Sequence, residues 1–245
     1  MNVSAAEWFT NWFSTPYYAI LYQHRNEQEA HLFLQKLIII LHIKISDSIL
    51  DVGCGEGRHA DFLQKSNFNV YGFDISPLHI ANAKKRNELV HFFVHDMRKP
   101  FPIANIKLLL NLFTSFGYFD AVEDDLIALQ NMYNAIDENG TIVIDFLNEQ
   151  FVRKNLIAND IKTIDGITFQ QSRKIESDFV YKTIFFKDYD NKYQTHIEKV
   201  RLYKKENIET MLKQVGFNDF QFFGNYNLDT FNLDNSPRLI IIAHK

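Results

Sequence analysis

The sequence predicts an α/β fold, a doubly wound and mostly parallel sheet of seven strands, with helices before it and a small antiparallel sheet inserted late in the chain. Two observations lead to this prediction. Between residues 45 and 150, short apolar runs alternate with segments of helical periodicity. The first run ends in a glycine cluster, and each of the next two is followed by an aspartate. Such alternation implies right-handed crossovers between parallel strands.

The opening segment, residues 1–44, is predicted to be helical. Its later part mixes apolar and polar residues at helical spacing, as in Leu32, Phe33, Lys36 and Leu37. The segment is rich in aromatic residues and ends where the alternating part of the chain begins.

The alternating part, residues 45–150, contains five expected strands and three expected helices. The strands are Ser48–Val52, Asn69–Phe73, Val90–Val94, Ile106–Leu112 and Thr141–Phe146. The helices are Arg58–Lys65, Pro77–Asn87 and Asp120–Ile136. Ser76 and Pro77 mark the start of the second helix, as N-cap and first helical residue. The fourth strand is almost wholly apolar, which is typical of a parallel strand covered on both faces.

The pattern changes after Asn148, and residues 160–203 are predicted to form the inserted antiparallel sheet. Three stretches there have period-two character, Ile167–Ser172, Val180–Lys187 and Tyr193–Tyr203, with turn residues between them. In the last part, residues 204–245, we expect a helix over Lys205–Gln214, stopped by Gly216, and two strands, Phe217–Phe223 and Arg238–Ala243. We expect all of residues 1–245 to form one domain.

The most informative stretch is the glycine-rich turn that follows the first strand. It places Gly53, Gly55 and Gly57 at alternate positions, in the order D-V-G-C-G-E-G. Glycine lets the backbone approach a ligand closely, and the helix that follows presents free N–H groups. The spacing differs from the G-x-G-x-x-G pattern of dinucleotide-binding proteins. Cys54 between the glycines is interpreted as a small filler, not as a nucleophile.

Two carboxylates mark the ends of the next two strands. Asp74 follows the second strand, where it can accept both hydroxyls of a ribose. Asp96 follows the third strand, where it can accept from an adenine amino group, or only cap the strand. Ile75 and Met97 would supply apolar walls. Ligands of open α/β sheets lie at the carboxyl ends of the strands, which is where all of these residues fall.

These motifs resemble those of the class I, Rossmann-like methyltransferases that use S-adenosylmethionine. The run from Ile49 to Asp74 resembles their first two motifs, His95-Asp96-Met97 their adenine-contacting motif, and Asn111-Leu112-Phe113 their motif after the fourth strand. The resemblance covers residues 45 to 150 well and the last 45 or so in outline. It implies that the last strand of the sheet is antiparallel to the others.

The resemblance also implies the cofactor, S-adenosyl-L-methionine, with S-adenosyl-L-homocysteine as product. Gly53 and Gly55 would pass beside its methionine part, Asp74 would hold the ribose and Asp96 the adenine. Asp51 would either contact the amino group or only orient the glycine turn. Related enzymes with an N-terminal helical segment use it as a lid, and some place an arginine from it on the methionine carboxylate. Arg25 is expected to have that role here. The residues expected to bind the cofactor are Arg25, Asp51, Gly53, Cys54, Gly55, Asp74, Ile75, Asp96, Met97, Asn111 and Leu112.

Candidates for catalysis and substrate binding come from the loop after the fourth strand, from the lid and from the insertion. Tyr118, in the aromatic loop Phe113–Phe119, is the preferred catalytic candidate, although these rings could instead cap the core. Glu198 and Arg201 are three residues apart on one strand, so one of them would face the cleft. The substrate candidates are Tyr18, Tyr22, Phe116, Asn148 and Arg201.

The sequence therefore predicts a methyltransferase acting on nitrogen or oxygen of a small-molecule acceptor. Its net charge of -4 and its lack of a polybasic segment argue against nucleic-acid and membrane partners. No spacing of histidine and cysteine residues indicates a metal site. The first residues show no signal-peptide pattern, so a cytoplasmic protein is expected. We expect it to be a monomer or a homodimer. The alternatives are an RNA or protein methyltransferase, an NAD-dependent oxidoreductase, and a binding module without turnover.

Overall fold

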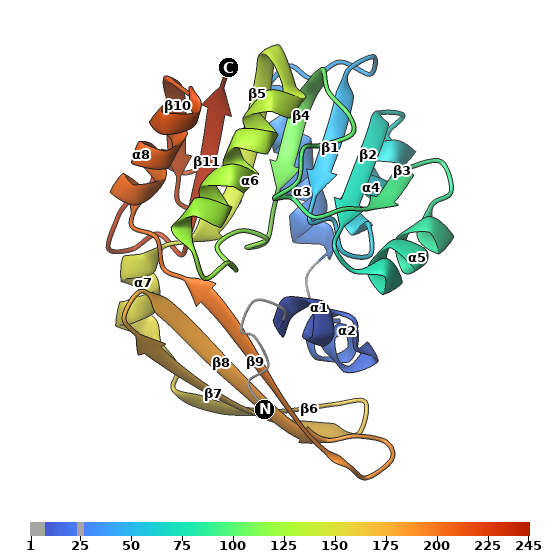
Figure 1. Cartoon of the computed structure of the whole chain (residues 1–245), viewed down its shortest axis with the longest axis vertical. Coiled ribbons are helices and arrows are strands. Elements are labelled where there is room, and N and C mark those ends of the chain that lie inside the picture. The colour runs from blue at the N-terminus through green and yellow to red at the C-terminus, as the bar shows by residue number, and fades with distance from the viewer. Residues whose placement is uncertain (1–7, 24–26) are drawn as a thin grey trace.

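The main feature of the computed structural model is a seven-stranded sheet with helices on both faces (Figure 1). The structure describes residues 8–23 and 27–245. The strands are β1 (Ser48–Val52), β2 (Asn69–Asp74), β3 (His91–Val94), β4 (Ile106–Asn111), β5 (Ile136–Leu147), β10 (Asp219–Phe223) and β11 (Arg238–His244). Their order is β10-β11-β5-β4-β1-β2-β3, and β11 runs antiparallel to both of its neighbours. The predicted fold class, including the antiparallel last strand, is confirmed.

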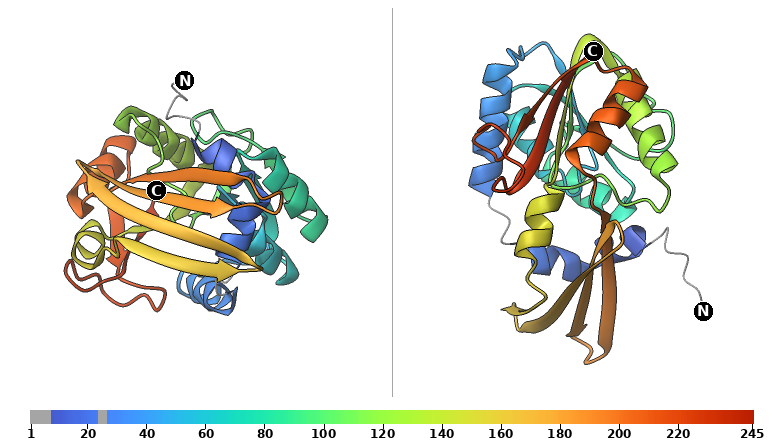
Figure 2. Two further views of the ribbon diagram at one scale, coloured as in Figure 1. Left: turned by 90° about the horizontal axis from the view of Figure 1, so that it is seen from below. Right: turned by 90° about the vertical axis from the view of Figure 1, so that its left-hand side faces the viewer.

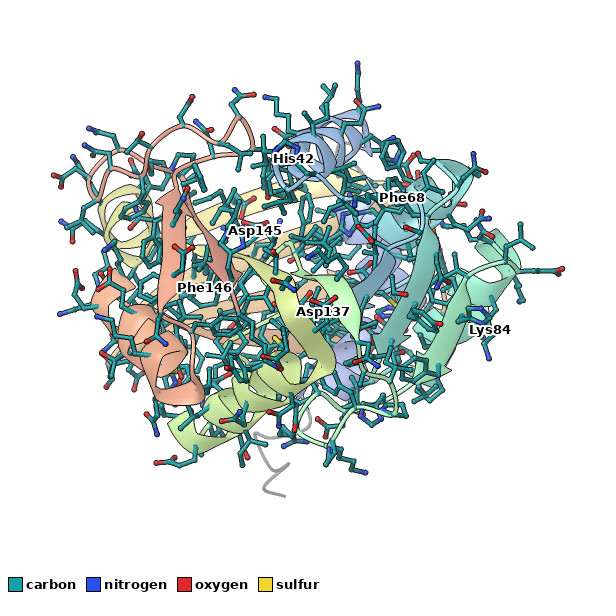
Figure 3. All side chains as sticks on the ribbon, turned by 90° about the horizontal axis from the view of Figure 1, so that it is seen from above. His42, Phe68, Lys84, Asp137, Asp145 and Phe146 are labelled. Atoms are coloured by element: carbon teal, nitrogen blue, oxygen red, sulfur yellow. The ribbon has the colours of Figure 1, made fainter. Side chains whose placement is uncertain are left out.

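Helices cover the two faces of this sheet in separate layers. On one face lie α3 (Glu27–Ile40), α4 (Arg58–Lys65) and α5 (Pro77–Arg86), and on the other α6 (Val122–Ala135) and α8 (Lys205–Val215) (Figures 1 and 2). Neighbouring residues of a strand face opposite layers, so Ile49 packs with the first set and Leu50 with the second. Figure 3 looks along the layers and shows Asp145 and Phe146 of β5 in the interior, both with no exposed surface.

The insertion forms a separate sheet below the carboxyl ends of the parallel strands (Figure 1). Its order is β6 (Asn159–Ile164), β7 (Ile167–Glu176), β8 (Phe179–Lys187) and β9 (Tyr193–Arg201), all antiparallel. The sequence predicted three of these strands and missed β6, as well as the short helix α7 (Glu149–Asn155) that leads into it. Strand β6 was missed because it has no period-two alternation and only one neighbour, β7, so most of its residues are exposed.

The first two helices, α1 (Trp8–Phe13) and α2 (Pro16–Tyr22), lie between the two sheets (Figures 1 and 2). We call them the α1–α2 segment. Trp12 and Leu21 of this segment share a buried cluster with Phe169 of β7 and Phe186 of β8. The same segment reaches the main domain through Ser14, whose hydroxyl lies 2.9 Å from that of Ser76 at the start of α5. The α1–α2 segment thus bridges the inserted sheet and the carboxyl end of the main sheet.

Candidate functional site

A cavity of about 480 Å³ lies between the carboxyl ends of β1 to β4 and the α1–α2 segment. Four loops of the main sheet and the two short helices supply its walls. The loops contribute Gly53, Cys54, Gly55, Asp74, Ile75, His95, Asp96, Met97, Leu112, Phe113, Ser115, Tyr118 and Phe119, and the helices contribute Phe9, Phe13, Tyr18, Ala19, Ile20 and Tyr22. A cavity of this size and place suits one small ligand bound at the strand ends.

The glycine turn after β1 is held by the neighbouring strand. The N–H groups of Gly53 and Cys54 both donate to the Phe73 carbonyl at 2.9 Å, and Gly53 and Gly55 have φ values of +70° and +54°. A Cβ added to Gly53 would lie 2.9 Å from that of Ser115, whereas a Cβ on Gly55 would meet no heavy atom within 4 Å. The backbone at Gly55 is therefore open to the cavity. An adenosyl cofactor passing along this turn fits that opening, because only a side chain at position 55 would block it.

Asp74 is held so that its carboxylate faces the cavity. Its Oδ2 accepts from the Gly55 N–H at 2.9 Å and its Oδ1 from the Ser76 N–H at 2.8 Å. The Nδ1 atom of His79, a cavity residue at the start of α5, lies 3.6 Å from Oδ1. A carboxylate has about four acceptor positions, so two backbone donors leave room for two hydroxyl groups. This is the chemistry that a ribose requires.

Asp96 lines the cavity beside Met97 and is bound by Arg98. The guanidinium donates to both carboxylate oxygens, with Nη2 to Oδ2 at 2.6 Å, and the Arg98 N–H donates to Oδ1 at 3.0 Å. Burial alone would raise the pKa of Asp96, but these hydrogen bonds from Arg98 outweigh it and hold the pKa below its ordinary value. Asp96 is thus a fixed acceptor for a donor group in the cavity, such as an exocyclic amine.

Two residues predicted to bind the cofactor lie behind the cavity wall. Asp51 is 1% exposed and lies with Oδ2 3.8 Å from His59 Nδ1. Its burial raises its pKa to about 7, against the lowering effect of Arg58. The Asn111 amide donates to the Val52 and Ser115 carbonyls at 3.0 and 3.3 Å. The Asn111 side chain therefore supports the segments that form the wall, and neither Asp51 nor Asn111 lines the cavity itself.

The loop after β4 closes one side of the cavity with aromatic rings. The Tyr118 ring lies 5.6 Å from that of Phe13, which in turn lies 4.7 Å from that of Tyr18, measured between ring centroids. All three line the cavity. Because aromatic faces attract cations, this wall suits a sulfonium or an ammonium group. The structure thus brings the catalytic candidate Tyr118 and the substrate candidate Tyr18 together.

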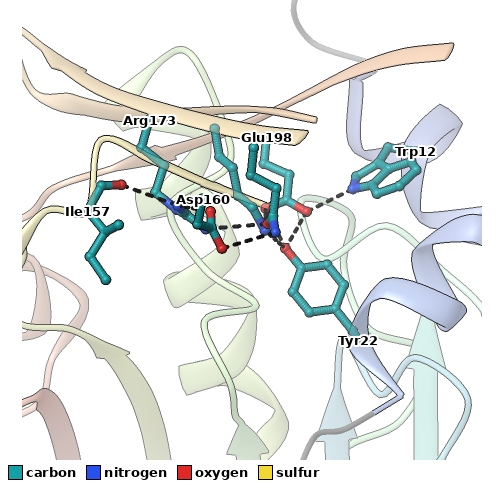
Figure 4. Close-up of polar contacts among 8 residues, drawn as sticks. Trp12, Tyr22, Ile157, Asp160, Arg173 and Glu198 are labelled. Atoms are coloured by element: carbon teal, nitrogen blue, oxygen red, sulfur yellow. Dashed lines mark hydrogen bonds and ion pairs between the residues drawn. The ribbon is translucent and has the colours of Figure 1, made fainter. Parts of the chain in front are cut away.

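Tyr22 connects the cavity to the inserted sheet (Figure 4). Its hydroxyl donates to Glu198 of β9 at 2.7 Å and accepts from Lys182 Nζ of β8 at 2.6 Å. The indole Nε1 of Trp12 donates to the same carboxylate at 2.8 Å. Of the two residues considered on β9, Glu198 faces the α1–α2 segment, and Arg201 faces the opposite side of the strand, where it donates to the Asp120 carbonyl.

Three of the five substrate candidates do not line this cavity. Phe116 is 1% exposed and packs against the Phe146 and Tyr203 rings in the core. Asn148 is 2% exposed and donates to the Leu233 and Ser236 carbonyls, and Arg201 is engaged at Asp120. Proximity to a strand end in sequence did not separate core residues from cavity residues, because the direction of a side chain in an irregular loop depends on the backbone path and follows no fixed period. Arg25, predicted for the methionine carboxylate, lies outside the described residues.

Other cavity residues were not foreseen. Arg58 and His59, the first residues of α4, line the cavity beside the glycine turn, and the Arg58 guanidinium lies 4.2 Å from the centroid of the Phe113 ring. His79 lines the cavity beside Asp74. A sequence signal existed for Arg58, since it directly follows the third glycine and opens the helix.

No group of three or more potential metal ligands is found among residues 8–23 and 27–245. In the same residues, no helix has the length and apolar character to span a membrane.

The comparison with known families decides the class of protein. The model of a methyltransferase-domain family matches residues 22–221. The chain belongs to this family. Together with the sheet order and the cavity at the strand ends, this makes it a class I methyltransferase that uses S-adenosylmethionine. The dinucleotide-dependent oxidoreductase considered from the sequence is thereby set aside.

Two curated relatives are similar to this methyltransferase. The N,N-dimethyltransferase of Streptomyces venezuelae that acts on dTDP-3-amino-3,4,6-trideoxy-alpha-D-glucopyranose is 25% identical over 125 residues, which are 50% of this chain and 52% of the relative. The chain thus aligns with about half the length of that enzyme. A protein of Geobacillus sp. (strain WCH70), whose name places it among methyltransferases, is 24% identical over 224 residues, covering 87% of this chain and 90% of the relative.

Solved structures share the whole fold. An S-adenosylmethionine-dependent methyltransferase from Clostridium acetobutylicum has a TM-score of 0.79 at 18% identity, covering 96% of this chain and 98% of that one. A sugar N-methyltransferase from Streptoalloteichus has a TM-score of 0.76 at 17% identity, covering 93% and 92%. At these identities the likeness concerns the fold alone.

Proposed function

We propose that this methyltransferase transfers a methyl group to a nitrogen or oxygen atom of a small-molecule acceptor. The observation that carries the proposal is the cover over the cavity. Helices α1 and α2 line the cavity opposite the strand ends and are held there by the inserted sheet, which leaves a bounded space that suits a small acceptor better than a polymer. Two similar proteins, the Streptomyces and Streptoalloteichus enzymes, are named for methylating amino groups of sugars.

We propose that the cofactor lies along the strand ends, with its methionine part at the glycine turn after β1 and its adenine at the end of β3. Gly53 and Gly55 would pass beside the methionine part, the Asp74 carboxylate would accept from the ribose hydroxyls, and Asp96 with Met97 would enclose the adenine. Each role follows from a contact: open backbone at Gly55, two free acceptor positions at Asp74, and an acceptor fixed by Arg98 at Asp96. When bound, the cofactor supplies a methyl group on a sulfonium that is already activated for transfer.

The remaining task of the protein is to align the acceptor and keep water away. Tyr118, Phe13 and Tyr18 form the aromatic wall that would face the sulfonium and the acceptor group. Tyr118 is the proposed catalytic residue, through its ring and through its hydroxyl as a hydrogen-bond partner of the acceptor. Tyr22 is hydrogen-bonded to both Glu198 and Lys182, and would thereby hold the α1–α2 segment in position over the cofactor.

The test of the acceptor class is a turnover assay that measures S-adenosylhomocysteine formed. Amino sugars, other small amines, small hydroxylated compounds, total RNA and a protein extract are compared at equal S-adenosylmethionine. We expect turnover with one of the small-molecule groups and none with RNA or protein. Turnover confined to RNA or protein would refute the proposed acceptor, and it would leave the cofactor site untouched.

The test of the cofactor placement is Asp74→Asn, with Asp219→Asn at the exposed start of β10 as its control. Asparagine has one acceptor oxygen where aspartate has two, and it carries no charge. Asp74→Asn should therefore weaken S-adenosylhomocysteine binding by about 1.5–3 kcal/mol, the range for hydrogen bonds to a charged group. Isothermal titration calorimetry measures the difference. Equal affinities of the two variants would contradict the placement of the ribose.

A further inference from the structure

Two neighbouring residues at the cavity adopt a backbone conformation that side chains other than glycine rarely take. Phe113, which lines the cavity, and Thr114 follow β4 after Leu112 and have φ values of +57° and +64°. Such residues persist only where the surrounding structure holds them in place, and they gather at functional sites. Something outside the turn must therefore fix it.

The turn is fixed by Asp145 of β5. The Phe113 N–H donates to Asp145 Oδ2 at 2.9 Å, and the Thr114 N–H donates to the Asp145 carbonyl at 3.0 Å. Asp145 has no exposed surface, and it accepts a further hydrogen bond from the Tyr226 hydroxyl at 2.9 Å. One buried residue thus receives both backbone donors of the strained turn.

Arg238, the first residue of β11, ties this carboxylate to the turn. Its Nε donates to Asp145 Oδ1 at 2.7 Å, and its Nη2 donates to the Thr114 hydroxyl at 2.8 Å. The guanidinium reaches both partners at once because its donors form a planar fork. A buried ion pair gives little net stability compared with apolar residues of the same size, so its contribution here is geometric. Neither Asp145 nor Arg238 lines the cavity.

The turn aims the Phe113 ring at one end of the cavity. That ring stacks on His59, with centroids 5.0 Å apart and planes 21° apart, and carries the Arg58 guanidinium at 4.2 Å on its face. Phe113, Arg58 and His59 all line the cavity beside the glycine turn. A shift of the Phe113–Thr114 backbone would therefore displace the wall that a ligand on the glycine turn meets.

We propose that Asp145 and Arg238 are positioning residues of this methyltransferase, which act through the Phe113–Thr114 turn to set the Phe113 ring and Arg58 against the amino-acid end of the bound cofactor. The proposal rests on the cofactor placement given above. It gives the C-terminal strand, far along the chain from the glycine motif, a part in cofactor binding.

The first experiment is Arg238→Lys, which keeps the charge but cannot span Asp145 and the Thr114 hydroxyl together. We expect the Kd for S-adenosylhomocysteine, measured by calorimetry, and the KM for S-adenosylmethionine to rise about tenfold, as for a lost charge-assisted hydrogen bond, with a smaller change in kcat. The control is Arg153→Lys on α7, where the arginine pairs with Glu149; its Kd should stay that of the wild type.

The second experiment separates positioning from general stability. If Arg238 acts through the turn, the double variant Arg238→Lys/Phe113→Ala should bind S-adenosylhomocysteine no more weakly than Phe113→Ala alone. All variants are compared at a temperature where near-ultraviolet circular dichroism shows native packing. Thr114→Val, which removes only the hydroxyl that Arg238 contacts, repeats the test should Arg238→Lys fail to fold.

The outcomes are distinguishable. An unchanged Kd in Arg238→Lys or Thr114→Val, or losses that multiply in the double variant, would overturn the positioning role while the proposed function stands. Wild-type protein that bound no S-adenosylhomocysteine would overturn the cofactor placement, and the positioning role with it. A raised Kd and no further loss in the double variant would support both.

Discussion

At the scale of single residues, Asp125 of α6 links stability to pH. It has no exposed surface, and its burial raises its pKa from an ordinary 3.8 to about 7, although the Tyr203 hydroxyl and the Gly117 N–H donate to it. Between these two pH values the folded protein holds a proton that the unfolded chain releases. Stability from this group is therefore full at low pH and is lost as the pH rises through about 7.

Asp125→Asn should remove this pH dependence. The amide cannot ionise, so the free energy of unfolding of the variant should fall less than that of the wild type between pH 4.5 and pH 7.5, by at most about 1.4 kcal/mol per pH unit. Urea denaturation at several pH values measures it. Asp219→Asn on the exposed strand end serves as control, and a slope in Asp125→Asn equal to that control would show that Asp125 is ionised in the folded state.

Gly55 permits a test of the glycine turn without a change in packing. Gly55 and Gly166 have φ values of +54° and +78°, and a Cβ on either would meet no heavy atom within 4 Å. Gly55→Val and Gly166→Val should therefore cost similar stability, about 1–2 kcal/mol for a left-handed residue. Of these two variants, Gly55→Val alone should abolish S-adenosylhomocysteine binding in calorimetry, because Gly55 lines the cavity and Gly166 does not. Retained binding in Gly55→Val would mean that the cofactor avoids the turn.

How far the sequence could predict the site follows from where each residue lies. Gly55, Asp74 and Asp96 were predictable because the ends of parallel strands meet at one edge of a sheet, whatever the loops do. Asp145 lies within the predicted strand Thr141–Phe146, and its partner Arg238 comes 93 residues later. That ion pair depends on β11 entering beside β5, which no local pattern in either strand indicates.

At the scale of elements, the α1–α2 segment is attached to the inserted sheet by a buried apolar cluster and by hydrogen bonds to one carboxylate. Glu198 accepts from both the Trp12 indole and the Tyr22 hydroxyl, and Lys182 Nζ lies 3.7 Å from it. Its side chain is 15% exposed, so these bonds are shielded from water. The predicted period-two strands located this sheet, but helical periodicity at the N-terminus could not indicate that Tyr22 would meet it.

Glu198→Gln should loosen the α1–α2 segment. Glutamine has one acceptor oxygen in place of two and removes the main counter-charge of the Lys182 ammonium, so docking should weaken by about 1.5–3 kcal/mol. Amide hydrogen exchange in residues 8–22 should then be faster by tenfold or more, and S-adenosylhomocysteine should bind more weakly. Glu176→Gln, on the exposed end of β7, is the matched control. Equal exchange in the two variants would assign the attachment to the apolar cluster around Trp12 instead.

At the scale of the whole molecule, the binding cavity joins parts of the chain that are otherwise separate. Its walls come from the α1–α2 segment and from four loops of the main sheet, and the inserted sheet holds the segment in place. A ligand that fills the cavity contacts the folded arrangement of all these parts and has no equivalent site in the unfolded chain. Binding must therefore stabilise the folded protein as a unit.

S-adenosylhomocysteine at about 100 times its Kd should stabilise the protein by about 2.7 kcal/mol. For a chain of this length each kcal/mol raises the Tm by about 2–4 °C, so the Tm should rise by roughly 5–11 °C. NAD at the same concentration is the matched control, because it contains the adenosine that Asp74 and Asp96 would hold. Its pyrophosphate would meet a turn whose glycine spacing differs from that of dinucleotide-binding proteins. Scanning calorimetry should show a shift with S-adenosylhomocysteine alone. An equal shift with NAD would mean that the cavity recognises only the nucleoside, and the glycine turn would lose its assigned role beside the methionine part.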